Sequence, residues 1–209
     1  MTTITPVFLA FDTSTAACTA ALFDGSGACI ARRDEVIGRG HAERLVPMIA
    51  DLLDGRAPER ILVGIGPGSF TGIRVAIAAA HGLAIGWGAE LLGLSSLALL
   101  AAGANAQEVV AAAVSGGHGE LFVQEFDAET LQPQSELRNL APDEAARMVT
   151  APLVVGSGAK VLVDHRGWGD ARELWPTAAD AFRLPEALRN FVPKPVYARA
   201  PDARVPEAA

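Results

Sequence analysis

The pattern of apolar and polar positions predicts that the chain begins with three short strands. Residues 7–11 and 17–23 are apolar runs, and the polar residues between them indicate a turn. The pair Asp24-Gly25 is typical of a hairpin turn and precedes a third run over residues 28–36. Because hairpins join antiparallel strands, these runs predict a meander.

Helical spacing follows the meander. Apolar residues recur every three or four positions over residues 41–53, which predicts a helix with one buried face. Pro47 lies within it and lacks a backbone donor, so we expect a kink or a start later than His41. The rest of the first half predicts, in order, a strand, a helix, a strand and a helix at residues 60–65, 70–86, 90–94 and 95–104.

The second half repeats the opening of the first. Apolar runs at residues 109–114 and 120–126 flank a glycine-rich turn at 115–119. The pattern continues with strands around 135–140 and at 153–155, a helix from Pro142, and helical patches as far as Asn190. Two similar openings suggest an internal duplication and an α/β protein of two related lobes, each a mixed sheet with packed helices.

These patterns divide the chain into three parts. Residues 1–104 form an N-terminal lobe and residues 105–192 a C-terminal lobe. Residues 193–209 hold four prolines and little apolar content, so we expect an extended arm or a loose tail.

Composition narrows the function classes. Half of the residues are hydrophobic, which excludes a disordered chain, and 17 basic against 24 acidic residues disfavour nucleic-acid binding by this chain alone. The longest apolar stretch, residues 75–87, is too short to span a bilayer. Because no basic region precedes the first apolar run, we expect a cytoplasmic protein without a secretory signal or a membrane partner.

Cysteine and histidine spacing offers little chemistry. Cys18 and Cys29 lie on neighbouring predicted strands, and we expect two buried free thiols rather than a disulfide. No two of the four histidines have the spacing of a helical metal pair, and no serine lies in a Gly-x-Ser-x-Gly elbow. We therefore expect neither a metal site nor a nucleophilic hydrolase.

The strongest local signal is a glycine turn between a strand and a helix, which holds Gly66, Gly68 and Ser69. Backbone donors at a helix N-terminus favour anions, so a phosphate is one candidate ligand. A tight connection with Ser69 as the helix cap is the other interpretation. Asp12 and Thr13, after the first strand, have the same two interpretations, a metal-bound phosphate or a turn closed by the aspartate side chain.

Small residues recur every fourth position on the second helix, at Gly72, Ala76, Ala80 and Ala84. Such a stripe lets another element approach closely. Internal packing against the sheet and an intermolecular interface are both consistent with it.

Three motifs, in order, resemble the signature of the bacterial TsaB family, also called YeaZ. They are FDTST at residues 11–15, HAERLVPMI at 41–49 and GPGSFTGIR at 66–74. The resemblance is close over residues 8–102 and returns weakly in PVYAR at 195–199. It implies the α/β fold of actin, Hsp70 and sugar kinases, which is ribonuclease H-like and has two lobes of related topology.

The resemblance also implies a function. Members act in making threonylcarbamoyladenosine (t6A) next to the anticodon of tRNAs that read codons beginning with A. The transferase TsaD transfers the group, and TsaB is its non-catalytic scaffold together with the ATPase TsaE. The implied partners are TsaD in a heterodimer, TsaE, and a second copy when TsaD is absent, with tRNA contacted only through the complex. No catalytic residue, metal or cofactor is implied, and ATP or ADP at the subunit junction stays open.

The family places its partner surface on the two predicted helices at residues 41–53 and 70–85, which favours the intermolecular interpretation of the stripe. The residues expected to bind a partner are His41, Glu43, Leu45, Met48, Ile49, Leu52, Gly72, Ile73, Ala76, Ile77, Ala80, Leu83 and Ala84.

Two departures argue against catalysis. TsaD has two metal-binding histidines at positions that fall near Ser96 and Leu100, and neither residue can replace an imidazole. Residues 115–117 are Ser-Gly-Gly where many members have Asp-Ala-Arg, so Asp12 would lack a partner carboxylate for a metal. An active sugar or acyl kinase of the same fold and a peptidase are the alternative functions.

Overall fold

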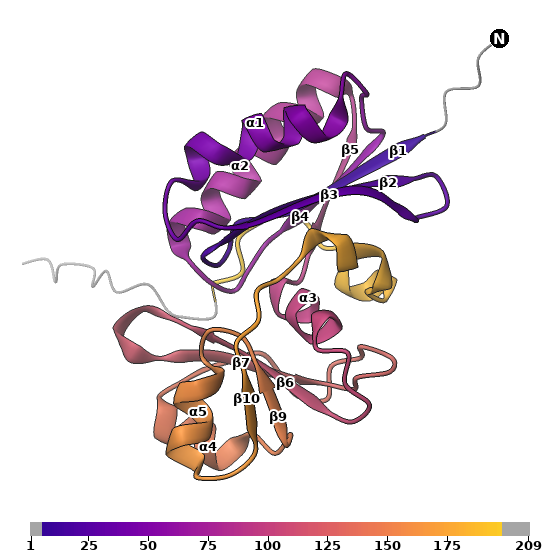
Figure 1. The fold of residues 1–209 in the computed structure, drawn as a ribbon. Coiled ribbons are helices and arrows are strands. Elements are labelled where there is room, and N and C mark those ends of the chain that lie inside the picture. The colour runs from indigo at the N-terminus through magenta and orange to yellow at the C-terminus, as the bar shows by residue number, and fades with distance from the viewer. Residues whose placement is uncertain (1–5, 198–209) are drawn as a thin grey trace, which may run out of the picture.

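The computed structural model describes residues 6–197 and contains two five-stranded sheets, one in each lobe (Figure 1). The first sheet has the strand order β3-β2-β1-β4-β5. Its central strand β1 pairs antiparallel with β2 and parallel with β4. The strands are β1 (Val7–Asp12), β2 (Ala17–Asp24), β3 (Cys29–Val36), β4 (Arg60–Gly64) and β5 (Glu90–Leu94).

The second sheet repeats this topology, with the order β10-β9-β6-β7-β8. Here β6 is central, antiparallel to β7 and parallel to β9. The strands are β6 (Val110–Ser115), β7 (Leu121–Phe126), β8 (Arg138–Leu140), β9 (Leu153–Val155) and β10 (Asp170–Arg172). The repeated order confirms the expected α/β architecture of two related lobes, each with a mixed sheet and packed helices.

Helices cover the sheets in layers (Figure 1). Helices α1 (His41–Leu53) and α2 (Phe70–Trp87) pack on the outer face of the first sheet, against alternate residues of its strands. Helices α4 (Pro142–Met148) and α5 (Ala159–Arg166) cover the outer face of the second. Helix α3 (Ser96–Gly103) lies between the two sheets, and its residues from Ser96 to Ala102 are buried.

The 3₁₀ helix η1 (Gly117–Gly119) lies between β6 and β7.

The chain that follows the second sheet returns to the first. It contains the 3₁₀ helices η2 (Ala178–Arg183) and η3 (Glu186–Leu188). Ala178 N donates to Thr19 Oγ1 at 2.8 Å, and the Phe182 ring contacts Phe23 with centroids 4.7 Å apart. The division into lobes at residues 104 and 105 stays a prediction. Part of the predicted arm, from residue 198 onward, lies outside the described residues.

Three expectations need correction. Helix α1 begins at His41 with Pro47 inside it, so the later start is wrong. Cys18 is buried and Cys29 is exposed, because β3 is the edge strand of the first sheet. Strand β10 was not expected from the sequence, since three exposed residues carry no periodic signal.

Candidate functional site

The turn after β1 and the glycine turn before α2 pack directly against each other. Ser69 N donates to the carbonyl oxygen of Ser14, and Thr13 Oγ1 donates to that of Gly72, both at 2.7 Å. A Cβ on Gly68 would lie 2.1 Å from the Ser14 carbonyl oxygen, and one on Gly72 would lie 1.9 Å from the Thr13 carbonyl oxygen. These glycines therefore permit the close approach of the two turns.

Several polar groups of the glycine turn form hydrogen bonds within the protein. Ser69 Oγ caps α2 by accepting from Gly72 N at 3.2 Å, as the capping interpretation expects. Gly66 N donates to Ser96 Oγ at 3.1 Å. Phosphate binding at this turn stays a prediction, while packing and capping account for its geometry.

Asp12 is fully buried at the end of β1. Its Oδ1 accepts from the Ser14 N and Oγ, both at 2.7 Å, and its Oδ2 accepts from Ser96 Oγ at 2.5 Å. A Cβ on Gly64 would lie 1.8 Å from Oδ2, so the neighbouring strand also closes on this carboxylate. These hydrogen bonds tie β1 to the beginning of α3. Asp12 and Thr13, which were candidates for phosphate binding, are both fully buried.

A cleft of about 1780 Å³ separates the two lobes beyond these turns. The turn after β6, at residues 115–118, faces residues 38–43 and 68–75 across it. Ser115 N donates to Ser157 Oγ at 3.1 Å on the second lobe's side. The aromatic and arginine side chains that line the cleft are Phe70, Phe122, Trp175, Tyr197, Arg39 and Arg74.

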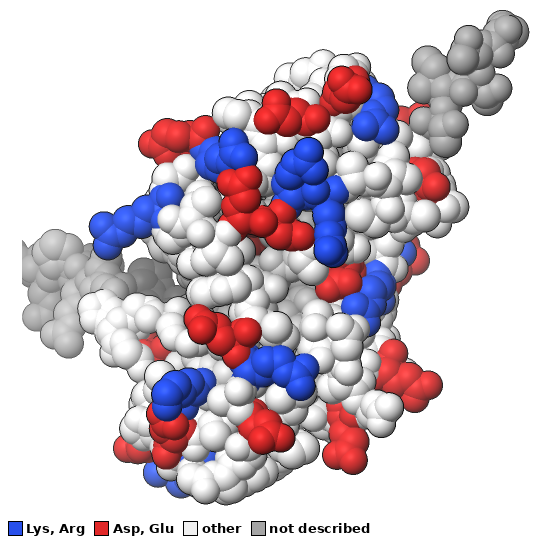
Figure 2. Space-filling view, in the orientation of Figure 1, with Lys and Arg blue, Asp and Glu red and all other residues white. Residues whose placement is uncertain are grey.

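The face of the molecule in Figure 2 carries acidic and basic side chains interspersed over both lobes. No broad patch of one sign covers this face. Arg44 pairs with Glu35 through two hydrogen bonds, at 2.7 and 2.5 Å, and the guanidinium lowers the pKa of that carboxyl. Pairs of this kind neutralise arginines that would otherwise attract a polyanion.

Burial separates the residues expected to bind a partner into two groups. Ten are buried within this chain: His41, Leu45, Met48, Ile49, Leu52, Gly72, Ile73, Ala76, Ile77 and Ala80. Glu43, Leu83 and Ala84 are at least partly exposed. Ala76 and Ala80 of the small-residue stripe are fully buried within this chain, which favours internal packing for these two residues. Partner binding by the expected residues stays a prediction.

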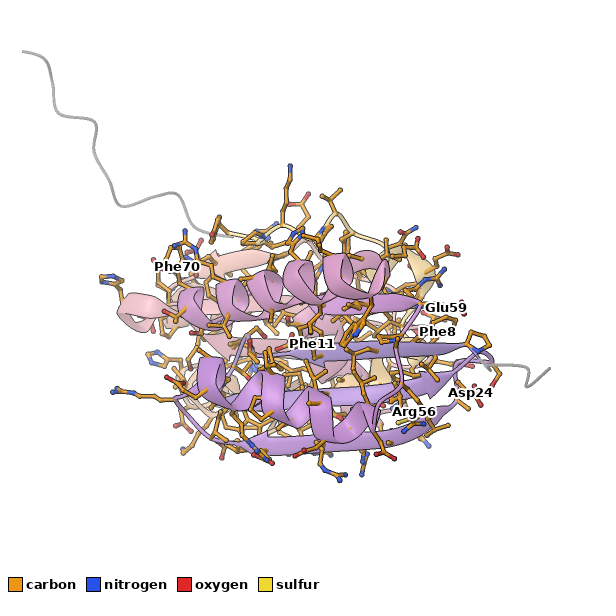
Figure 3. The ribbon with its side chains drawn as sticks, turned by 90° about the horizontal axis from the view of Figure 1, so that it is seen from above. Phe8, Phe11, Asp24, Arg56, Glu59 and Phe70 are labelled. Carbon is orange, nitrogen blue, oxygen red and sulfur yellow. The ribbon has the colours of Figure 1, made fainter. Side chains whose placement is uncertain are left out.

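The opposite side of the two helices is open to solvent. Val46, Phe70 and Ile85 are 46%, 54% and 84% exposed, although all three are large apolar residues. Figure 3, seen from above, shows α1 and α2 side by side over the sheet. We call this exposed face, with Val46, Phe70 and Ile85, the outer face of α1 and α2. Sequence periodicity did not distinguish the exposed face of α2 from its buried face, because α2 is apolar on most sides.

Histidines and other metal ligands do not converge in the part of the chain that is described. Within residues 6–197, no three His, Cys, Asp or Glu side chains are placed to hold a metal ion. His41 begins α1 and is buried, and its Nε2 has no hydrogen-bond partner among residues 6–197. His118 adopts a left-handed conformation, with φ of 60°, at the edge of the cleft.

Sequence reasoning missed two features of the site. Ser96 was compared with a metal ligand of a relative, whereas its hydroxyl holds Asp12. Arg74 and Tyr197 belong to two separate sequence motifs. The structure brings them together across 123 positions of sequence, with Arg74 Nε donating to the Tyr197 hydroxyl at 3.1 Å. Nothing in the sequence signals such a distant contact.

Among residues 6–197, α2 is the one helix long and apolar enough to cross a bilayer, judged by length and composition alone. A core helix of a soluble protein can have the same length and composition.

Comparisons with known proteins agree on one family. A family model described as TsaD, the tRNA N6-adenosine threonylcarbamoyltransferase, matches residues 34–161. The tRNA threonylcarbamoyladenosine biosynthesis protein TsaB of Escherichia coli K12 is 36% identical over 130 residues, which are 58% of this chain and 55% of that protein. TsaB of Haemophilus influenzae is 34% identical over 133 residues, 59% of this chain and 55% of that protein. The chain thus spans about half the length of the curated relatives it matches.

Solved structures extend the similarity to nearly the whole chain. YeaZ from Pseudomonas aeruginosa is 31% identical, with a TM-score of 0.77 over 92% of this chain and 99% of that one. An uncharacterized P. aeruginosa protein described as similar to peptidase YeaZ is 32% identical, with a TM-score of 0.77 over 93% of this chain and 100% of that one. Both the family model and these structures cover more than half of this chain. The chain therefore belongs to the TsaB family, also called YeaZ.

Proposed function

We propose that this chain is a non-catalytic subunit of the complex that forms threonylcarbamoyladenosine in tRNA, and that it binds and activates a TsaD-type transferase. The relatives named TsaB support the pathway, and the match to the TsaD family model supports a relation to the transferase. TsaE, a second copy of the chain and tRNA bound through the complex are the other partners of this proposal. Its place is the cytoplasm.

The observation that carries the proposal is the outer face of α1 and α2. A helix that keeps Phe70 and Ile85 in water leaves apolar surface unburied, and such surface is typical of interaction sites. Val46 extends the face onto α1. The partner would therefore meet the exposed side of the helices, beside Glu43, Leu83 and Ala84.

The non-catalytic part of the proposal is supported by Asp12. An active kinase of this fold would need a carboxylate free to hold Mg-ATP at the cleft. Asp12 is instead buried, and its two oxygens accept three hydrogen bonds from Ser14 and Ser96. The kinase alternative would need these bonds to break, so we favour a scaffold.

The test is tRNA modification with purified TsaD, TsaE and threonylcarbamoyl-AMP synthase, with and without this chain. We expect modification to require the chain, and we expect size-exclusion chromatography to show its complex with TsaD. Unchanged modification without any complex would contradict the proposal. Tight, metal-dependent ATP binding by the isolated chain would favour the kinase instead.

A matched pair of variants locates the surface. Ile85→Glu places a charge on the outer face, and Ile30→Glu makes the same change at an exposed isoleucine of β3. We expect Ile85→Glu to abolish the complex and Ile30→Glu to preserve it. If both variants bound TsaD equally well, the partner surface would not include Ile85 of α2.

A further inference from the structure

The last described segment, residues 191–197, includes the beginning of the C-terminal arm and passes from strand β5 to the first turn of α2. Phe191 and Gly93 exchange two backbone hydrogen bonds, at 3.0 and 2.7 Å. Val196 N donates to the carbonyl oxygen of Ile65 at 2.9 Å. These contacts bring Tyr197 beside Phe70 and hold residues 193–197 of the arm on the first lobe.

Tyr197 completes a cluster of three exposed side chains, which we define as the Arg74 cluster: Phe70, Arg74 and Tyr197. The Arg74 guanidinium carbon lies 3.5 Å from the Phe70 ring centroid and 5.9 Å from that of Tyr197. The two rings are 5.6 Å apart. Phe70 is 54% and Tyr197 51% exposed. Figure 3 places Phe70 at the beginning of α2, across the molecule from Phe8 and Glu59.

Arg74 lacks a charge partner in residues 6–197, where no carboxylate forms an ion pair with it. The other well-stacked arginine is used differently. Arg166 lies 3.7 Å from the Trp168 ring centroid, but its Nη1 donates to the carbonyl oxygens of Val149 and Ala151. Arg166 therefore serves the fold, whereas the outer nitrogens of Arg74 are available to an acceptor on another molecule.

The cluster is continuous with the outer face. Phe70, Arg74, Ala78 and Gly82 follow at four-residue intervals, all are exposed, and Ile85 lies one turn further on. Tyrosine and arginine are the residue types that most often dominate binding energy at interfaces. The ring contacts and the Tyr197 hydrogen bond already order the guanidinium, so binding would lose little further side-chain freedom.

We propose that the Arg74 cluster anchors the partner at the beginning of α2, that Arg74 pairs with a carboxylate of that partner, and that Tyr197 from the arm holds the guanidinium in position. The inference rests on the proposed function, because the partner is the TsaD-type transferase. It gives the C-terminal arm a role in recognition, with Tyr197 as a positioning residue.

The test is the affinity of the full chain for the purified transferase from the same genome, measured by calorimetry at several salt concentrations. We expect Arg74→Gln to weaken binding at least about tenfold, as loss of one member of a charge pair does. We also expect it to flatten the salt dependence. Tyr197→Phe keeps the ring and loses the hydrogen bond, so a loss of about threefold is expected, against about tenfold for Tyr197→Ala.

The control is Trp168→Ala, which removes an exposed ring stacked on an arginine in the other lobe. It should bind within about twofold of the unmutated chain. Circular dichroism of each variant checks that the fold is intact. Arg74→Gln with unchanged affinity and salt dependence would overturn the inference and leave the proposed function standing. If the unmutated chain failed to bind the transferase, both would fall.

Discussion

At the scale of single residues, Asp12 shows how this chain uses a carboxylate where phosphate chemistry was one expectation. Its hydrogen-bond partners are the hydroxyl groups of Ser14 and Ser96 and the backbone amide of Ser14. Removing it would leave donors of Ser14 and Ser96 unpaired in the interior. Its part in the fold is to join the turn after β1 to the beginning of α3, which is far away in sequence.

The other informative single residue is Cys18, for which we predict a pH effect on stability. Burial, with a smaller contribution from the Glu35 carboxylate, raises the pKa of this thiol from 9.0 to about 11. Below pH 9 the thiol is protonated in both states and the free energy of unfolding is unaffected. Between pH 9 and 11 only the unfolded chain loses the proton, so this free energy should fall by about 1.4 kcal/mol per pH unit.

Urea unfolding at pH 8, 9, 10 and 11 checks this expectation. Other groups titrate in the same range, so the comparison is with Cys18→Ala, which lacks the thiol. The unmutated chain should lose stability more steeply above pH 9 than this variant. Parallel curves would show that Cys18 does not cause the effect.

At the scale of elements, α2 contains a matched pair of glycines. A Cβ on Gly72 would lie 1.9 Å from the Thr13 carbonyl oxygen, whereas one on Gly82 has nothing within 4 Å. We predict that Gly82→Ala raises the free energy of unfolding by up to about 1 kcal/mol, because alanine favours the helix. Gly72→Ala should lower it by about 3 kcal/mol, since the two turns must separate.

Chemical denaturation of the two variants measures the difference. Both substitutions have the same intrinsic effect on helix propensity, so opposite signs isolate the contact with the turn after β1. A stabilising Gly72→Ala would mean that the glycine turn does not need its close approach to Thr13.

The same elements show what the sequence could predict. Periodicity placed β1 to β5 and the helices α1 to α3 within two residues of their ends, because each carries a local pattern. It could not choose which face of α2 is buried, since Phe70, Ile73, Ile77 and Ile85 surround the helix with apolar side chains. The contacts of Asp12 with Ser96 link segments 84 positions apart and have no local signature.

At the scale of the whole molecule, the two lobes share one core. The hydrophobic cluster around α3 includes Ala10 and Leu62 of the first sheet and Val110 and Val114 of the second. Helix η2 adds a second connection, where Thr177 Oγ1 donates to Asp34 at 2.7 Å. Neither sheet can therefore unfold without exposing apolar surface of the other.

We predict that the lobes unfold in one cooperative transition. The tryptophans report on both sides, because Trp87 ends α2 and Trp168 follows α5. Fluorescence of two variants, Trp87→Phe/Trp175→Phe and Trp168→Phe/Trp175→Phe, should give urea midpoints that coincide with that of far-UV circular dichroism. Two separated midpoints would show that the lobes unfold independently.

Helix α3 finally sets how freely the two lobes can diverge in evolution. A change of side-chain size at Leu97, Leu99 or Leu100, each at most 1% exposed, must be accommodated in a core that both sheets share. Outer positions such as Ala78 or Ile85 are exposed and lie outside this shared core. The two lobes can thus acquire different surfaces while their common helix restricts change at the centre.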